Sequence, residues 1–207
     1  MPKVALSIVL FLVSGLPGPN ALAQKSPPKP VMSKQSLTPE QITIYRAVLF
    51  HYTKGDPVPL ALASRTEPFS RQFEETAVCM GDVLLPEPDA IPIVHRIDPA
   101  VALSDRMTIV NAHQGETVEE SDGGSPIQGG NESHKPSTGQ ASENFVMPPN
   151  ATDLFTFTEI IFNKEHTRAA VQNSSVCGGL CGVGGTLVFT VEDGEWKLNS
   201  VCSGWIS

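Results

Sequence analysis

Four cysteines, and the spacing of two of them, constrain this 207-residue chain more than any other feature. Cys177 and Cys181 lie in the glycine-rich run Val176-Cys-Gly-Gly-Leu-Cys-Gly, while Cys79 and Cys202 stand apart from it. A C-x3-C pair predicts a disulfide, a metal site or a redox centre. The compartment in which the protein folds decides between these interpretations, because disulfides persist in oxidising surroundings.

The N-terminus predicts export. Lys3 is followed by an apolar stretch from Val4 to Leu16, and Ala21-Leu22-Ala23 precedes Gln24. A charged start, a short apolar core and an A-x-A site, in this order, are typical of a cleaved signal peptide. We therefore expect residues 1–23 to be removed and the mature protein to be secreted or periplasmic.

In such a compartment, a disulfide framework is the simplest role for Cys79, Cys177, Cys181 and Cys202. Zinc is a second interpretation, but the spacings outside the C-x3-C pair match no zinc ribbon or finger. A thiol redox centre is a third, although redox enzymes place C-x-x-C at the start of a helix and the glycines here disfavour one. We predict neither a metal nor a cofactor.

The chain is acidic, with 14 basic and 22 acidic residues and a formal charge of -8. Removal of residues 1–23 takes away Lys3 and no acid, so 13 basic residues minus 22 acidic residues gives -9. Phosphate backbones repel such a chain, and it has no basic run, so nucleic acid is not an expected partner. After residue 23 we expect no membrane span, because no apolar segment is long enough. The expected partner is therefore an extracytoplasmic protein or a small molecule.

Composition divides the mature chain into parts. Residues 24–37 are rich in Pro, Lys and Ser and predict a linker. Residues 111–150 are mostly small or polar, so they bury too little apolar surface to offset the entropy of ordering them. We expect a flexible acidic insert there, with an ordered lid as the alternative. Residues 38–207 otherwise predict a single α+β domain.

An amphipathic helix is predicted from Thr38 to Tyr52. Thr38 is suited to cap it, Pro39 to occupy its first turn and Gln41 to complete a capping box. Apolar residues then recur at steps of three and four, which is the helical period. They are Ile42, Tyr45, Val48, Leu49 and Tyr52.

Strand patterns dominate the rest of the chain. Residues 60–63 and 107–110 are short candidates, and residues 155–162, 168–176, 186–192 and 195–202 are longer ones. One early helix with later strands, and no alternation between them, predicts an α+β fold. We expect the N-terminal helix to pack on a mainly antiparallel sheet that ends in a C-terminal β-meander.

The turn Asp193-Gly194 predicts the register of the last hairpin. A two-residue turn pairs Glu192 with Glu195, and uninterrupted pairing then brings Gly185 opposite Cys202. Cys202 is thereby predicted on the face that carries Trp196 and Leu198.

This register predicts the disulfide connectivity. Gly185 follows Cys181 by four positions, so Cys202 is expected to bond Cys181 or Cys177. The remaining loop cysteine would then bond Cys79, and a bond between Cys177 and Cys181 is disfavoured. A one-residue slip would move Cys202 to the other face and overturn the prediction.

No common catalytic motif is present, and we predict no catalytic residue. The sequence lacks G-x-S-x-G, H-E-x-x-H, a P-loop and a dinucleotide fingerprint. Its acids and histidines are expected on solvated turns or surfaces. The set comprises Asp82, Glu87, Asp89, His95, Asp98, Glu165 and His166.

The C-terminal segments resemble a family of functionally unassigned exported bacterial proteins. The likeness rests on residues 159–171, on VCGGLCG at 176–182, on Gly185-Thr-Leu-Val-Phe and on Asp193-Gly-Glu-Trp-Lys-Leu. It covers about the last fifty residues, with fainter likeness at 38–52 and 106–110, and implies no activity or ligand. Where that family tends to carry an aromatic residue before Val-Cys, this chain has Asn173-Ser174-Ser175. A more distant likeness to NTF2-like and cystatin-like proteins implies a fold but no function.

We therefore expect an exported, disulfide-stapled, non-catalytic binding or interaction domain. The first alternative is a small-molecule-binding or hydrolytic pocket between the helix and the concave face of the sheet. The second is a thiol redox protein. Such a pocket would place acids or histidines with shifted pKa values among apolar side chains.

Overall fold

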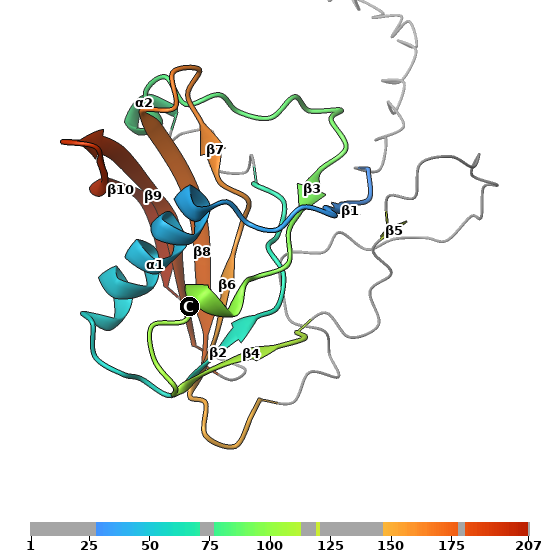
Figure 1. The fold of residues 1–207 in the computed structure, drawn as a ribbon, viewed down its shortest axis with the longest axis vertical. Helices are drawn as coiled ribbons and strands as arrows, with labels where there is room; N and C mark the ends of the chain where they lie inside the picture. The colour runs from blue at the N-terminus through green and yellow to red at the C-terminus, as the bar shows by residue number, and fades with distance from the viewer. Residues whose placement is uncertain (1–27, 71–76, 113–118, 121–146, 178–180, 207) are drawn as a thin grey trace, which may run out of the picture.

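A computed structural model describes residues 28–70, 77–112, 119–120, 147–177 and 181–206 (Figure 1). In these residues the chain is a mixture of α and β structure, mostly sheet with few helices. The predicted mixture is thus confirmed. The expected signal peptide, residues 1–23, lies outside the described residues.

Helix α1 spans Pro39–Thr53 and begins where the sequence predicts. The Gln41 N–H donates to Thr38 Oγ1 at 3.2 Å, and the Thr38 N–H donates to Gln41 Oε1 at 2.9 Å. Both bonds of the capping box are therefore present. The helix ends at Lys54, which has a left-handed backbone, and Gly55 follows with φ 79°.

The main sheet has seven strands. They are β2 (Leu60–Ala63), β4 (Met107–Val110), β6 (Asp153–Phe157), β7 (Ile161–Phe162), β8 (Arg168–Val176), β9 (Gly182–Glu192) and β10 (Glu195–Ile206). The order is β10-β9-β8-β6-β2-β4, and β7 also pairs with β8. From β6 to β10 all pairs are antiparallel, but β2 runs parallel to both β4 and β6. The sequence patterns did not indicate these parallel pairs.

A second, smaller sheet contains β1 (Val31–Met32) between β3 (Ile93–Val94) and β5 (Glu119–Glu120), with both pairs parallel. Strand β1 lies in the segment expected to be a linker, and Leu37 in the same segment is buried. The end of that segment is therefore part of the fold. Two short helices complete the described elements, α2 (Ala77–Met80) and the 3-10 helix η2 (Pro99–Val101).

The expected insert at 111–150 lies largely outside the described residues. Its first and last parts belong to the fold, because Ala112 is buried and Met147 packs with Ala112 in a cluster on β2 and β6. Along the described parts of the chain, no helix is both long and apolar enough to cross a membrane.

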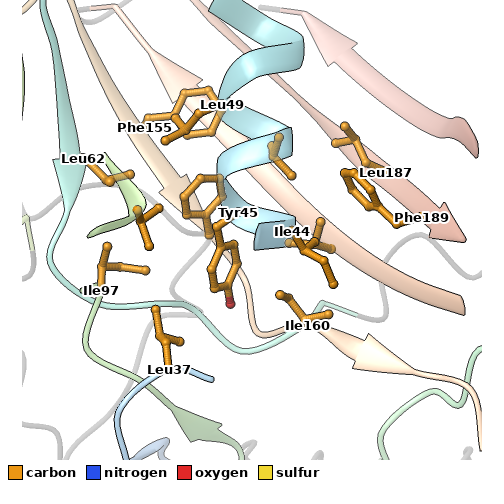
Figure 2. Packing of buried hydrophobic residues seen from close by; sticks show 14 of the residues in the cluster. Leu37, Ile44, Tyr45, Leu49, Leu62, Ile97, Phe155, Ile160, Leu187 and Phe189 are labelled. Atoms are coloured by element: carbon orange, nitrogen blue, oxygen red, sulfur yellow. The ribbon is translucent and has the colours of Figure 1, made fainter. Parts of the chain in front are cut away.

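The main cluster of buried apolar residues combines side chains of α1 with side chains of β2, β6, β8 and β9 (Figure 2). Tyr45 stacks on Phe157 with ring centroids 4.7 Å apart. Its hydroxyl donates to the Thr158 carbonyl at 3.0 Å, so the one polar atom of this buried ring has a partner. A second cluster, which contains Met80, Ala170 and Val188, lies on the other face of β8 and β9.

Candidate functional site

All four cysteines form disulfides, but not in the predicted combination. Cys79 is bonded to Cys202, with Cα atoms 5.5 Å apart, and Cys177 to Cys181, with Cα atoms 5.3 Å apart. The prediction that Cys202 bonds Cys181 or Cys177 is therefore wrong. The connectivity that the register disfavoured is the one present.

The error arises from two irregularities in the pairing of β9 with β10. The turn and the first pairs, up to Leu198 opposite Phe189, follow the prediction. The register then shifts between Leu198 and Ser200, and again between Val201 and Ser203. Each β-bulge inserts a residue, and an inserted residue moves the following side chains to the other face. Cys202 consequently packs against the second cluster, where α2 brings Cys79 to it.

The second disulfide closes the loop between β8 and β9. Cys177 directly follows β8, Cys181 directly precedes β9, and both side chains are exposed. The Cys177 N–H donates to the Cys181 carbonyl at 3.1 Å. Residues 178–180 of the VCGGLCG run lie outside the described residues.

A buried amide without hydrogen-bond partners lies near the end of β8. Asn173 pairs with Phe157 on β6 and Gly185 on β9, and its side chain is only 5% exposed. Neither Nδ2 nor Oδ1 has a hydrogen-bond partner. Most buried polar groups in proteins are paired, so an unpaired amide at this depth calls for an explanation. No motif in the sequence pointed to this residue.

The surroundings of Asn173 are aromatic and apolar on one side and polar on the other. Tyr52 of α1 lies beside it, and the Tyr52 ring meets Phe155 edge-on at 5.6 Å. Burial raises the pKa of the Tyr52 phenol, and the nearby Asn173 amide opposes that shift. The contact lies outside normal hydrogen-bond geometry, so both polar atoms of the amide remain unpaired. Two residues further along, the Ser175 hydroxyl donates to Asp153 Oδ1 at 3.4 Å.

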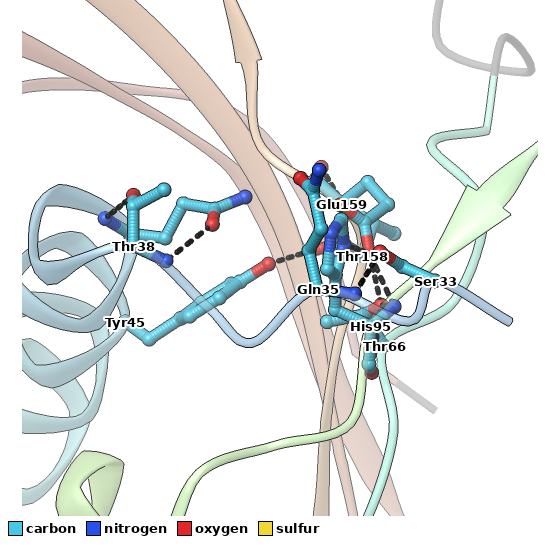
Figure 3. Close-up of polar contacts among 9 residues, drawn as sticks. Ser33, Gln35, Thr38, Tyr45, Thr66, His95, Thr158 and Glu159 are labelled. Atoms are coloured by element: carbon cyan, nitrogen blue, oxygen red, sulfur yellow. Dashed lines mark hydrogen bonds and ion pairs between the residues drawn. The ribbon is translucent and has the colours of Figure 1, made fainter.

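A second polar cluster consists of Thr66 in the loop after β2, His95 directly after β3, and Glu159 between β6 and β7 (Figure 3). Glu159 Oε1 accepts from the His95 N–H at 2.8 Å and from the Thr66 hydroxyl. Both Glu159 carboxylate oxygens lie 3.0 Å from His95 Nδ1. The two side chains are each 15% exposed. Burial, followed by the charge of Glu159, raises the pKa of Tyr45 well above its ordinary value.

A carboxylate at Nδ1 favours the tautomer of His95 that carries its proton there, which leaves Nε2 as an acceptor. Within the described part of the chain, no hydrogen bond to Nε2 is formed. Ser33 continues the pairing of β1 with β3 and lies opposite His95, with its N–H donating to the Val94 carbonyl at 2.7 Å. A groove of about 470 Å³ follows residues 32–37 and 96–99 and has Ser33 in its lining.

The other acids and histidines are mostly where the sequence predicts. Glu87, Asp89, Glu165 and His166 are exposed, and Asp98 caps η2 by accepting from the Ala100 N–H at 2.7 Å. A hydrogen bond from Asn163 lowers the pKa of the exposed Asp82. His95 differs from the prediction, since Glu159 and Thr66 hold it in a mostly buried position. Its partner Glu159 stood among apolar residues and was not in the predicted set.

No metal centre is indicated among the described residues, where no group of three His, Cys, Asp or Glu side chains could hold an ion. Comparison with known proteins gives no match to a protein family, to a curated protein or to a solved structure. The candidate sites therefore rest on the geometry of this chain.

Proposed function

We propose that the protein is an exported, disulfide-stapled domain that binds a small polar molecule at Asn173 without transforming it. The observation that carries this proposal is the buried amide with neither its donor nor its acceptor satisfied. Leaving such a group unpaired costs a folded protein about 1–3 kcal/mol. A ligand that offers an acceptor and a donor side by side would remove that cost.

The neighbours of Asn173 indicate the chemistry of this ligand. Tyr52 and Phe155 offer aromatic contact, while Asn173 and the Tyr52 hydroxyl offer hydrogen bonds. A compact neutral molecule with an amide or imide group matches this set.

Replacing Asn173 by leucine is expected to abolish binding and to raise the free energy of unfolding by about 1–2 kcal/mol, because an unpaired amide is replaced by an apolar group. Thermal-shift measurements with lactams and cyclic imides would detect the ligand class in the unmodified protein. The loss of the shift in Asn173→Leu would assign it to this residue.

The neighbouring Gln172 provides the matched control. It is also 5% exposed, but its Nε2 donates to the Ser70 carbonyl at 2.9 Å and its Oε1 accepts from the Ser70 N–H at 2.9 Å. Gln172→Leu should therefore destabilise the fold by about 1–3 kcal/mol. If Asn173→Leu destabilises the protein as much as Gln172→Leu, or if no compound of the panel shifts the midpoint, the proposal is wrong.

The second candidate function is ester hydrolysis at Ser33, and the orientation of His95 by Glu159 favours it. In this scheme His95 Nε2 takes the Ser33 hydroxyl proton while Oγ bonds to the acyl carbon. The leaving alcohol then receives that proton, and water hydrolyses the acyl-serine. Glu159 is the positioning residue, because it holds the imidazole without touching the substrate.

A fluorophosphonate probe tests this candidate directly. Ser33 Oγ would bond to phosphorus, fluoride would leave and His95 would take the proton, so the expected result is one labelled serine in the native protein. Labelling should be lost in Ser33→Ala and reduced about 100-fold or more in His95→Gln. Ser36→Ala, which alters another serine of the same groove, should label normally. Absence of labelling, or equal labelling of Ser33→Ala, would exclude the candidate.

A thiol redox function is the remaining alternative. Its support is the exposure of both Cys177 and Cys181 at the surface, where a reductant reaches them. It has no oriented base or helix start beside the pair among the described residues, and those features usually activate such thiols.

We also propose a family, a cellular location and a more detailed fold for this protein. The VCGGLCG run and its flanking strands support membership of the exported bacterial family, and the two disulfides support a secreted or periplasmic location. The shared cluster of α1 with β8 and β9 supports an NTF2-like or cystatin-like arrangement of one helix over an antiparallel meander. We place the signal peptide at residues 1–23.

A further inference from the structure

The last strand, β10, forms one edge of the main sheet. It spans Glu195–Ile206 and pairs only with β9 in the described structure, so its outer edge has no strand beside it there (Figure 1). An edge strand presents backbone N–H and C=O groups that can pair with another chain. Natural proteins usually protect long edges with charged residues or proline.

The part of β10 that follows Lys197 lacks that protection. From Leu198 to Ile206 the strand contains no Asp, Glu, Lys, Arg or Pro. Three of its apolar side chains are exposed instead, with Val201 at 49%, Trp205 at 36% and Ile206 at 87%. The charged residues near this strand lie at the opposite end, where Lys197 contacts Glu192 and Asp193.

This part of the strand is also held in place before any partner arrives. The Cys79–Cys202 disulfide ties it to α2. Trp205 lies over Gly184, where an added Cβ would come within 2.5 Å of the indole Nε1. From Ser203 to Ile206 the pairing with β9 is regular. A strand that is already ordered loses little entropy when it pairs with a second strand.

We infer that β10 pairs edge to edge with β10 of a second copy of this chain, antiparallel and about a two-fold axis within Val201–Ile206. Two mature copies with a charge of -9 each repel one another over most of their surface, and this neutral stretch removes the repulsion where they meet. Antiparallel self-pairing satisfies the same backbone groups on both copies, and it brings the same apolar side chains together. An interface of one strand pair is small, so the dimer should be weak, roughly micromolar or weaker.

Sedimentation velocity of the mature protein, residues 24–207 with both disulfides formed, tests the inference over a concentration series. The expected result is a reversible monomer–dimer equilibrium, with amide hydrogen exchange in 201–206 slowing as the dimer forms. Val201→Lys combined with Ile206→Lys should weaken dimerisation about tenfold or more, because like charges then face each other. Ile91→Lys is the control, since Ile91 is 61% exposed and precedes β3 of the smaller sheet, whereas β10 belongs to the main sheet.

Three results would overturn the inference. The unmodified chain could stay monomeric throughout the series. The lysine pair on β10 could leave the dimer intact, which would place the interface elsewhere. The Ile91→Lys control could weaken the dimer as strongly as the β10 variant, which would make the effect one of net charge. None of these outcomes bears on ligand binding at Asn173, so the two proposals fail separately.

Discussion

Replacing Cys79 and Cys202 together by alanine is expected to lower the free energy of unfolding by about 3–5 kcal/mol. The disulfide joins positions 123 residues apart, so the loop that it closes in the unfolded chain is long. On a chain-entropy treatment such a bond restricts the unfolded state by about 5 kcal/mol. It also holds Cys202 against Met80 and Val188, and some of that packing would be lost with it.

The pair Cys177 and Cys181 supplies the internal control. Their bond closes a separation of only 4 residues, for which the same treatment gives about 2 kcal/mol. Urea unfolding of the two double-alanine variants should therefore give a clearly lower midpoint for the Cys79/Cys202 variant. Equal midpoints would show that loop closure is not what this bond contributes.

The elements that the sequence predicted well are those whose causes are local. The capping box of α1 lies within Thr38–Gln41, and the Asp193-Gly194 turn has both residues at positive φ, as a two-residue hairpin turn requires. Each depends on residues close together in the chain. The parallel neighbours of β2 instead come from β4 and β6, far along the sequence, and no local pattern specifies such partners.

The disulfide prediction failed because the sequence does not mark the β-bulges of β10. Alternation of side chains along a strand predicts a face only while pairing is uninterrupted. Asn199 and Cys202 each stand at a register shift, and neither residue type marks a bulge. The first shift was enough to turn Cys202 from the face of Leu198 to the face of Val188.

Neither candidate site could be predicted from the sequence. Asn173 belongs to a run of small polar residues that resembles an exposed strand end, and only pairing on both sides of β8 shows it to be buried. His95 and Glu159 are 64 positions apart and meet because the loop after β6 approaches the end of β3. Sites assembled from distant segments require the tertiary structure before their chemistry can be argued.

The second large effect is expected in the aromatic core, where Phe157→Ala should lower the free energy of unfolding by about 3–5 kcal/mol. Phe157 is only 1% exposed and stacks on Tyr45 of α1, and its ring also meets Phe155 edge-on at 5.3 Å. Removing the ring leaves a cavity between α1 and the centre of the sheet, and a core that is packed from both sides refills little of it.

Phe50→Ala is the control for this substitution, because Phe50 lies on the same helix as Tyr45 but is 59% exposed. Its effect should stay within about 0.5 kcal/mol, as for surface substitutions away from special features. Denaturant unfolding followed by tryptophan fluorescence would measure both variants. A loss below about 1 kcal/mol for Phe157→Ala would mean that the contact between α1 and β6 contributes little to stability.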